Sequence, residues 1–187
     1  MIVIGGGAAI LVGRGRDNNS FKLINTATGA SQEVKSGTDA YIAVDSCNVL
    51  TESIAVQVVG AGAVKGNTSA GNVSNSDLSV SNCVYTLSPA SGAVLEKANN
   101  TKVASVLVRA PKTKAGADSN KAIFSSSKPA GVQDVSGVGD KAFFNPKFGQ
   151  LNVLKGSNDY IVTSHTGGAL SGTLETDKKL SDVLTYK

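Results

Sequence analysis

The chain has 187 residues, of which 41% are hydrophobic, 17% charged and 5% aromatic, and it contains no Trp. This composition excludes a collagen, a coiled coil and a wholly disordered chain, and it suits one domain with a modest core. Twenty-one Gly and four Pro among many Ser, Thr and Asn predict numerous turns between short elements.

The net charge of +4 is spread unevenly along the chain. Residues 101–155 carry nine basic and three acidic side chains. Such a surplus can gather on one face and attract an anionic surface. The predicted basic face consists of Lys102, Arg109, Lys112 and Lys114, followed by Lys121 and Lys128. Solvated lysines are the simpler interpretation, because no aromatic residues interleave with them as in single-strand nucleic-acid binders, and no nucleic-acid partner is expected.

The N-terminal run Met1–Val12 is apolar and contains three consecutive glycines. It is similar to the strand and glycine turn of a dinucleotide site, but Ile10 replaces the third glycine and a loop follows the run instead of a helix. Twelve helical residues span about 18 Å of the roughly 30 Å hydrocarbon layer of a membrane. Residues 1–13 are therefore expected to be a truncated membrane anchor or signal segment, in helical form.

Residues 14–44 contain isolated apolar side chains among Thr, Ser, Gly, Asn and Lys, with no sustained period. This stretch predicts either a tether or a short edge hairpin. In the hairpin, Phe21–Ile24 pairs with Ser31–Lys35 across Thr28 and Gly29.

A short helix is predicted over Thr51–Gly60, which starts with a capping residue and an early acid and stops at a glycine. Its β-branched residues leave a strand as the competing interpretation. The following residues, Gly60–Asp77, are rich in Gly, Asn, Ser and Thr and predict a polar loop.

Two antiparallel strands are predicted next. Leu78–Leu87 alternates between two faces, and Val103–Ala110 forms the second strand after a return across Ser88–Lys102. A helix is then expected over Asp118–Ser127, ended by a Lys-Pro pair. The side chains it is expected to bury are Ala122, Ile123 and Phe124.

Val135–Phe144 predicts a glycine-kinked turn that leads into a strand. Two more strands, Gln150–Lys155 and Asp159–Ser164, flank a hairpin turn of Gly, Ser and Asn.

A closing amphipathic helix is expected from about Thr176. Its apolar positions at helical spacing are Leu174, Leu180, Val183 and Leu184. The order helix, two strands, helix, three strands, helix predicts an α+β domain over residues 45–187. This domain is a mostly antiparallel sheet of about five strands covered by two or three helices.

The two cysteines, Cys47 and Cys83, are too few for a metal site alone and lack Cys-x-x-Cys spacing. A disulfide closing a loop of about 36 residues would stabilise the fold by about 4 kcal/mol. Such a bond persists only in an oxidising compartment. Two buried reduced thiols in a cytosolic protein are the alternative.

Three separated segments follow one another in a familiar order. They are Ser46-Cys47-Asn48-Val49-Leu50-Thr51 opening a helix that ends at Gly60, then Asn82-Cys83-Val84-Tyr85, then Val138-Gly139-Asp140-Lys141-Ala142-Phe143 before a Leu-x-Val strand and a glycine hairpin. Over roughly residues 45–187, this order resembles the small extracytoplasmic domains of actinobacterial and related lipoproteins of unknown function. It is similar to sensor domains outside some bacterial membrane kinases and, more loosely, to the PsbP-like fold.

The resemblance implies a Cys47–Cys83 disulfide that ties the first helix to the sheet. It also implies a ligand-binding or scaffolding role without catalytic residues. The chain departs from the pattern in having no lipobox cysteine near its start, so the implied attachment is by a helix.

No catalytic, cofactor-binding or metal-ligating set is expected, and the chain is not expected to be an enzyme. His165 is the only histidine and follows a predicted strand, and no serine lies in a G-x-S-x-G elbow. No calcium loop, zinc cluster or phosphate loop occurs. Asp140 is expected to accept backbone N–H bonds rather than to act as an acid.

The sequence therefore favours a membrane-anchored, extracytoplasmic binding or sensor-like domain of a bacterial cell. Its expected partner is an unknown surface or cell-envelope ligand, held between sheet and helices beside a turn. The residues of that candidate binding turn are Gly137, Gly139, Asp140 and Lys141. The alternatives are a structural surface protein, such as a pilin-like filament subunit, and an intracellular enzyme with an N-terminal cofactor strand.

Overall fold

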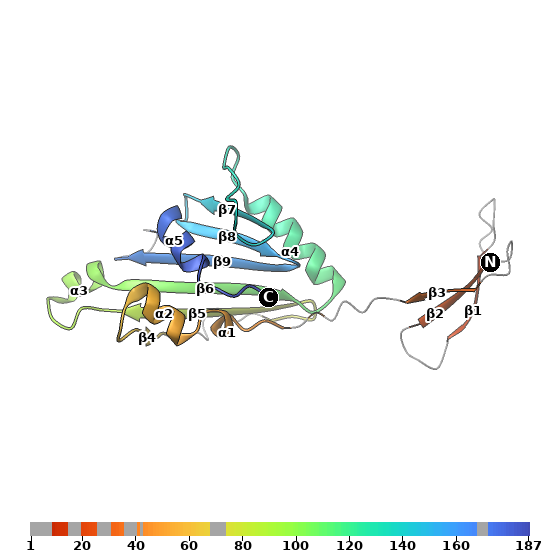
Figure 1. Cartoon of the computed structure of the whole chain (residues 1–187), viewed down its shortest axis with the longest axis horizontal. Coiled ribbons are helices and arrows are strands. Elements are labelled where there is room, and N and C mark those ends of the chain that lie inside the picture. Colours follow the sequence, from red (N-terminus) through yellow and green to blue (C-terminus); the bar gives the residue numbers. More distant parts are fainter. Residues whose placement is uncertain are drawn as a thin grey trace. The chain divides into compact units, whose positions relative to one another are not determined.

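The structure is a computed structural model that describes residues 9–14, 20–25, 31–35, 41, 43–67, 74–167 and 172–187. The chain divides into two compact units, residues 1–40 and 41–187 (Figure 1).

The first unit contains a three-stranded antiparallel sheet in the order β1-β2-β3. Its strands are β1 (Ala9–Arg14), β2 (Ser20–Asn25) and β3 (Ser31–Lys35). Phe21 of β2 lies opposite Val34 of β3, and Ile24 lies opposite Ser31. This is the pairing expected for the edge hairpin.

Strand β1 occupies part of the run for which an anchor helix was expected, so the helical expectation is wrong for residues 9–13. The run contains Ile10 and Val12, which favour strands, and β2 pairs with Ile10 and Leu11. Residues 1–8 lie outside the described residues. Among the described helices, none is long and apolar enough to cross a membrane.

The second unit is built on a six-stranded antiparallel sheet in the order β4-β5-β6-β9-β8-β7. The strands are β4 (Val64–Lys65), β5 (Leu78–Leu87), β6 (Lys102–Pro111), β7 (Lys141–Asn145), β8 (Gln150–Lys155) and β9 (Asn158–Thr166). The α+β class and the antiparallel sheet agree with the sequence prediction. Strand β4 was not predicted, because two residues are too few to show a period.

The helices of this unit lie on both faces of the sheet (Figure 1). They are α1 (Ser46–Val49), α2 (Glu52–Val59), α3 (Val94–Asn100), α4 (Lys114–Ser127) and α5 (Leu174–Ser181). Alternate side chains of a strand point to opposite faces, and the buried residues sort accordingly. Val106 and Val162 share the larger core with Leu180 of α5, whereas Phe143 packs against Phe124 of α4 on the other face.

Helix α4 begins one turn earlier than predicted, because the hydroxyl of Thr113 accepts the backbone N–H of Gly116 and caps it. An earlier start changes which side chains face the sheet. The buried residues of α4 are Gly116, Ala117, Asn120 and Phe124. Burial was therefore predicted correctly for Phe124 but wrongly for Ala122, which is exposed, and Ile123, which is half-buried.

Helices α2 and α5 differ in how closely they follow the prediction. Helix α2 is capped by Thr51 and ends at Gly60, as predicted. Helix α5 begins after Thr173 and is shorter than expected. It buries Leu180, and Leu184 is buried beyond its end, but the two other predicted apolar positions, Leu174 and Val183, are exposed.

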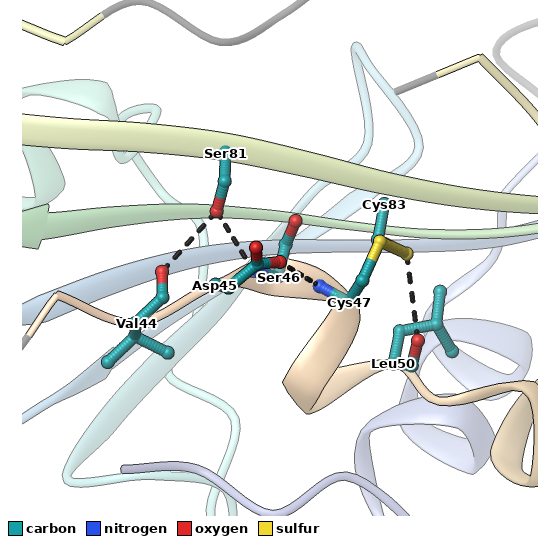
Figure 2. Close-up of a disulfide and its surroundings, with 7 residues drawn as sticks. All are labelled: Val44, Asp45, Ser46, Cys47, Leu50, Ser81 and Cys83. Atoms are coloured by element: carbon teal, nitrogen blue, oxygen red, sulfur yellow. Dashed lines mark hydrogen bonds between the residues drawn. A yellow bond between two sulfur atoms is a disulfide. The ribbon is translucent and has the colours of Figure 1, made fainter. Parts of the chain in front are cut away.

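Cys47 of α1 and Cys83 of β5 form a disulfide, with their Cα atoms 5.1 Å apart (Figure 2). Asp45 caps α1 by accepting the Cys47 N–H at 2.7 Å. The backbone N–H of Ser46 donates to the hydroxyl of Ser81 on β5 at 2.9 Å. Helix α1 is thus held to the sheet by one covalent bond and one neighbouring hydrogen bond.

Gly139 packs the turn before β7 closely against β8. Its φ is +56°, and a Cβ atom added there would lie 2.5 Å from Cγ1 of Val153 and 2.7 Å from the carbonyl oxygen of Leu154. Gly137, two residues earlier, has a φ of +78° but open space around it. A side chain at Gly137 would therefore meet only the unfavourable backbone conformation, whereas a side chain at Gly139 would also be crowded by its neighbours.

We expect Gly139→Ala to lower the free energy of unfolding by about 3 kcal/mol, because it adds overpacking to an unfavourable left-handed φ. Gly137→Ala carries the backbone cost alone and should lose about 1 kcal/mol. Urea unfolding of the two variants measures the difference, and equal losses would contradict the crowding at Gly139.

Candidate binding groove

A pocket of about 220 Å³ lies on the face of the sheet that carries α2 and α5. Its lining residues are Gln57 and Val58 of α2, Ser164 of β9, Thr176 and Lys179 of α5, and Val183 just beyond α5. We call this pocket the α2–α5 groove. It combines aliphatic walls with hydroxyl, amide and ammonium groups.

The groove follows from the way the two helices bury their apolar sides. Thr176, Lys179 and Val183 recur at helical spacing and line one side, while Leu180 between them is buried in the core. On α2, Ala55 and Val59 are buried, so Gln57 and Val58 are left at the opposite wall. Ser164 lies below both helices and forms the floor of the groove, and its small side chain leaves space above it.

The size and chemistry of the groove restrict what it can hold. Pockets for drug-sized ligands usually measure about 300 to 1,000 Å³, so this groove suits a small group. Val58 and Val183 provide apolar contact, and Lys179 provides a positive charge at the rim. Nζ of Lys179 lies 2.8 Å from Oε1 of Glu175, but both side chains are exposed, and such pairs exchange readily with other partners.

A buried carboxylate of α5 lies beside the floor. Oδ1 of Asp177 accepts the backbone N–H of Ser164 at 2.7 Å, and Asp177 is fully buried. Its Oδ2 has no hydrogen-bond partner in the part of the chain that the structure describes. Burial raises the pKa of Asp177 to about 7, although hydrogen bonds from the backbone N–H groups of Ser164 and Leu151 oppose the shift.

A second polar cluster lies under α4 on the opposite face. The side-chain amide of Asn120 donates to the carbonyl oxygens of Arg109 and Ser157, at 2.7 and 2.9 Å. Asp159 lies opposite Arg109 in the sheet, and burial raises its pKa to about 6 against the attraction of the Arg109 charge. Because Asn120 joins α4 to β6 and to the β8–β9 hairpin, this cluster holds the fold together.

The predicted binding turn is held to the same hairpin. Oδ1 of Asp140 lies 2.7 Å from Nζ of Lys155, and its Oδ2 accepts the backbone N–H of Gly156 at 2.7 Å. These two bonds lower the pKa of Asp140. Asp140 therefore does accept a backbone N–H, as predicted, and both of its oxygens are engaged. Lys141, the first residue of β7, is exposed.

The turn and the α2–α5 groove lie at opposite ends of β9. Asp140 contacts the hairpin that begins β9, whereas Ser164 is six residues further along the strand than Asn158, a distance of about 20 Å. Gly137, Gly139, Asp140 and Lys141 thus do not line the groove. Their role as a binding turn stays a prediction.

The four residues of the predicted basic face are not brought together. Lys102 begins β6, and Lys112 follows its other end, about 30 Å away. Nζ of Lys112 donates to the carbonyl oxygen of Asn75 at 2.8 Å, and Lys114 pairs with Asp118 on α4. Arg109 is half-buried beside Asp159.

His165 lies in β9, opposite Val103 of β6. It is half-buried, and its Nδ1 atom has no hydrogen-bond partner among the described residues. Because it follows Ser164 in a strand, it faces away from the groove. No group of three or more His, Cys, Asp and Glu in the described ranges could hold a metal ion.

In comparisons with protein-family models, curated proteins and solved structures, nothing matches this chain.

Sequence reasoning missed the residues that line the groove. Gln57, Ser164 and Lys179 are ordinary polar residues far apart in the sequence, so no motif connects them. One signal was present at α5, where Thr176, Lys179 and Val183 recur at helical spacing. That signal was hidden because Val183 was counted with Leu180 among the apolar positions of the predicted amphipathic helix.

Asp177 predicts a characteristic dependence of stability on pH. Folding keeps a proton on Asp177 that the unfolded chain, with the ordinary pKa of 3.8, has already released. The free energy of unfolding therefore falls as pH rises from about 4 to about 7 and is level above that. A shift of this size corresponds to at most about 4 kcal/mol.

We expect Asp177→Asn to remove this decline, so that the variant gains stability relative to the wild type between pH 5 and pH 8. Asp159 contributes a similar decline up to about pH 6 in both proteins, and it cancels in the comparison. Urea unfolding across this pH range measures the effect. Glu175→Gln, at an exposed position of the same helix, is the control and should leave the decline in place. Parallel curves for Asp177→Asn and wild type would refute the assignment.

Proposed function

We propose that the chain is a membrane-anchored, extracytoplasmic binding domain that holds a small group of a surface or cell-envelope ligand in the α2–α5 groove. The observation that carries this proposal is the groove itself, one wall of which is fixed through the Cys47–Cys83 disulfide. Membrane attachment is proposed from the apolar sequence of the N-terminal run alone, because residues 9–14 of that run form strand β1 instead of the expected helix.

The disulfide supports an extracytoplasmic location. Disulfides persist in secreted and surface proteins and are rare where glutathione keeps thiols reduced. Cys83 is fully buried and Cys47 is half-buried, so reductants reach the bond poorly. It joins α1 to the sheet, and loss of such a bond from a small domain typically costs about 2 to 5 kcal/mol.

The arrangement of the groove favours binding over catalysis. Hydrolytic catalysis by a serine requires a base within hydrogen-bonding reach of the nucleophile. Ser164 faces the groove while His165 faces the other side of the sheet. Asp177 accepts a backbone N–H from the strand below, which suits a residue that positions β9 against α5.

The lining residues favour a ligand group with an apolar body and an anionic end. Val58 and Val183 form apolar walls, and the ammonium of Lys179 attracts a carboxylate at the rim. Gln57 can donate or accept a hydrogen bond at the same opening. The expected affinity for an isolated small group is millimolar, since few atoms are in contact.

We expect benzoate to bind the groove more tightly than its neutral analogue benzamide, and benzylamine to bind least, because Lys179 repels a cation. Two-dimensional NMR titration of the full chain measures this order. Amide signals of Gln57, Ser164 and Lys179 should shift together, with one dissociation constant in the millimolar range.

Val183→Trp fills the groove and should abolish these shifts. Val56→Trp places the same side chain on α2 outside the lining residues and should retain them. Shifts that persist in Val183→Trp, or that map elsewhere, would count against the groove as the binding site.

The location is tested by the mass of the native protein from its host, alkylated before and after reduction. We expect a mass two hydrogens below that of the dithiol form, with no alkylation until the protein is unfolded and reduced. Two thiols that react directly in the unfolded, unreduced protein would place the chain in a reducing compartment.

A further inference from the structure

Among the described residues of the domain, helix α3 presents the two most exposed large apolar side chains. Val94 is 88% exposed and Leu95 is 73% exposed, and α3 buries none of its residues. Helices in proteins normally owe their stability to an apolar face packed against the core. The apolar residues of α3 have no such partner among the described residues.

The structure nevertheless holds α3 firmly at the end of the sheet (Figure 1). The hydroxyl of Thr101 donates to the carbonyl oxygen of Lys97 at 2.8 Å and lies 2.8 Å from the hydroxyl of Ser88. The backbone N–H of Gly167, after β9, donates to the carbonyl oxygen of Thr101 at 2.8 Å. A Cβ atom on Gly167 would lie 2.8 Å from the carbonyl oxygen of Asn99, so the glycine permits this close approach.

Further apolar and basic residues lie at the same end of the sheet. Val64 of β4 is 65% exposed and lies opposite Thr86, next to the last residue of β5. Lys65 follows it, Lys97 lies three residues after Val94 on α3, and Lys102 begins β6. We call this set of Val64, Lys65, Val94, Leu95, Lys97 and Lys102 the α3 tip.

The charge of the α3 tip is positive. Among the described residues, none of its three lysines forms an ion pair within 4.0 Å. The one acidic residue of α3, Glu96, directs Oε2 to the backbone N–H of Ala93 at its own helix start. Exposed aliphatic side chains flanked by lysines are the combination that binds an anionic lipid interface.

We propose that the α3 tip docks on the surface of an anionic lipid bilayer, with Val94 and Leu95 entering the interface and the lysines contacting lipid headgroups. A second copy of the chain is the weaker partner, because a symmetric dimer would place the same positive patch against itself. The proposal does not depend on the α2–α5 groove, and its failure would leave the groove unaffected.

The test is co-sedimentation of the full chain with vesicles of phosphatidylcholine alone or mixed with equal phosphatidylglycerol. We expect binding to increase with phosphatidylglycerol. Val94→Ser combined with Leu95→Ser should weaken binding to the mixed vesicles at least about tenfold, because two aliphatic side chains lose their burial. Lys97→Gln combined with Lys102→Gln should reduce the preference for phosphatidylglycerol by at least about tenfold.

The matched control is Val56→Ser combined with Leu174→Ser, which removes the same two side-chain types from exposed positions outside the tip. It should bind like the wild type, and it shows whether other parts of the chain account for vesicle binding. Equal binding by the tip and control variants would overturn the proposal. A change in sedimentation mass caused by the tip substitutions without vesicles would also overturn it, since the tip would then join copies of the chain.

Discussion

The bond between the Sγ atoms of Cys47 and Cys83 holds α1, the first helix of the domain, against strand β5 of the sheet. Helix α1 is a single turn and α2 has eight residues, lengths at which helices are unstable alone in water. Without Trp and with few other aromatic residues, the core has few large side chains to hold them. Helix α2 directly follows α1 and forms one wall of the groove, so a covalent bond outside the groove supports that wall.

Among the described residues of the domain, Asp159 and Asp177 are the two deeply buried carboxylates. They have different surroundings, and each lowers the free energy of unfolding at neutral pH. Asp159 lies opposite Arg109 in the sheet, so the opposite charge of Arg109 offsets part of the energetic cost of burying the carboxylate. Asp177 accepts hydrogen bonds from the backbone N–H groups of Ser164 and Leu151, and burial raises its pKa further, to about 7. An apolar side chain at Asp177 would leave the Ser164 N–H without its acceptor. The carboxylate therefore joins α5 to the backbone of β9 at this point.

The sequence predicted the elements whose signals are local. Strand β5 was located to both ends by its alternation, and Thr51 and Gly60 marked α2 because capping acts within a few residues. Helix α3 was missed, since Ala93 is a poor capping residue and its apolar residues have no core to face. The groove was missed for another reason: its floor and walls come from elements that only the sheet order brings together.

The distribution of basic residues on the surface also could not be predicted from the sequence. The basic surplus of residues 101–155 suggested one face, but β6 is an extended strand that carries Lys102 to one end of the sheet and Lys112 to the other. Lys112 and Lys114 then bind oxygen atoms of their own chain. Lys102 instead lies at the same end of the sheet as Lys65 and Lys97. Both of these lysines come from outside residues 101–155, and Lys97 belongs to a helix that the sequence did not predict. A surface charge is set by strand direction and sheet order, so the net charge of a segment does not determine what the surface attracts.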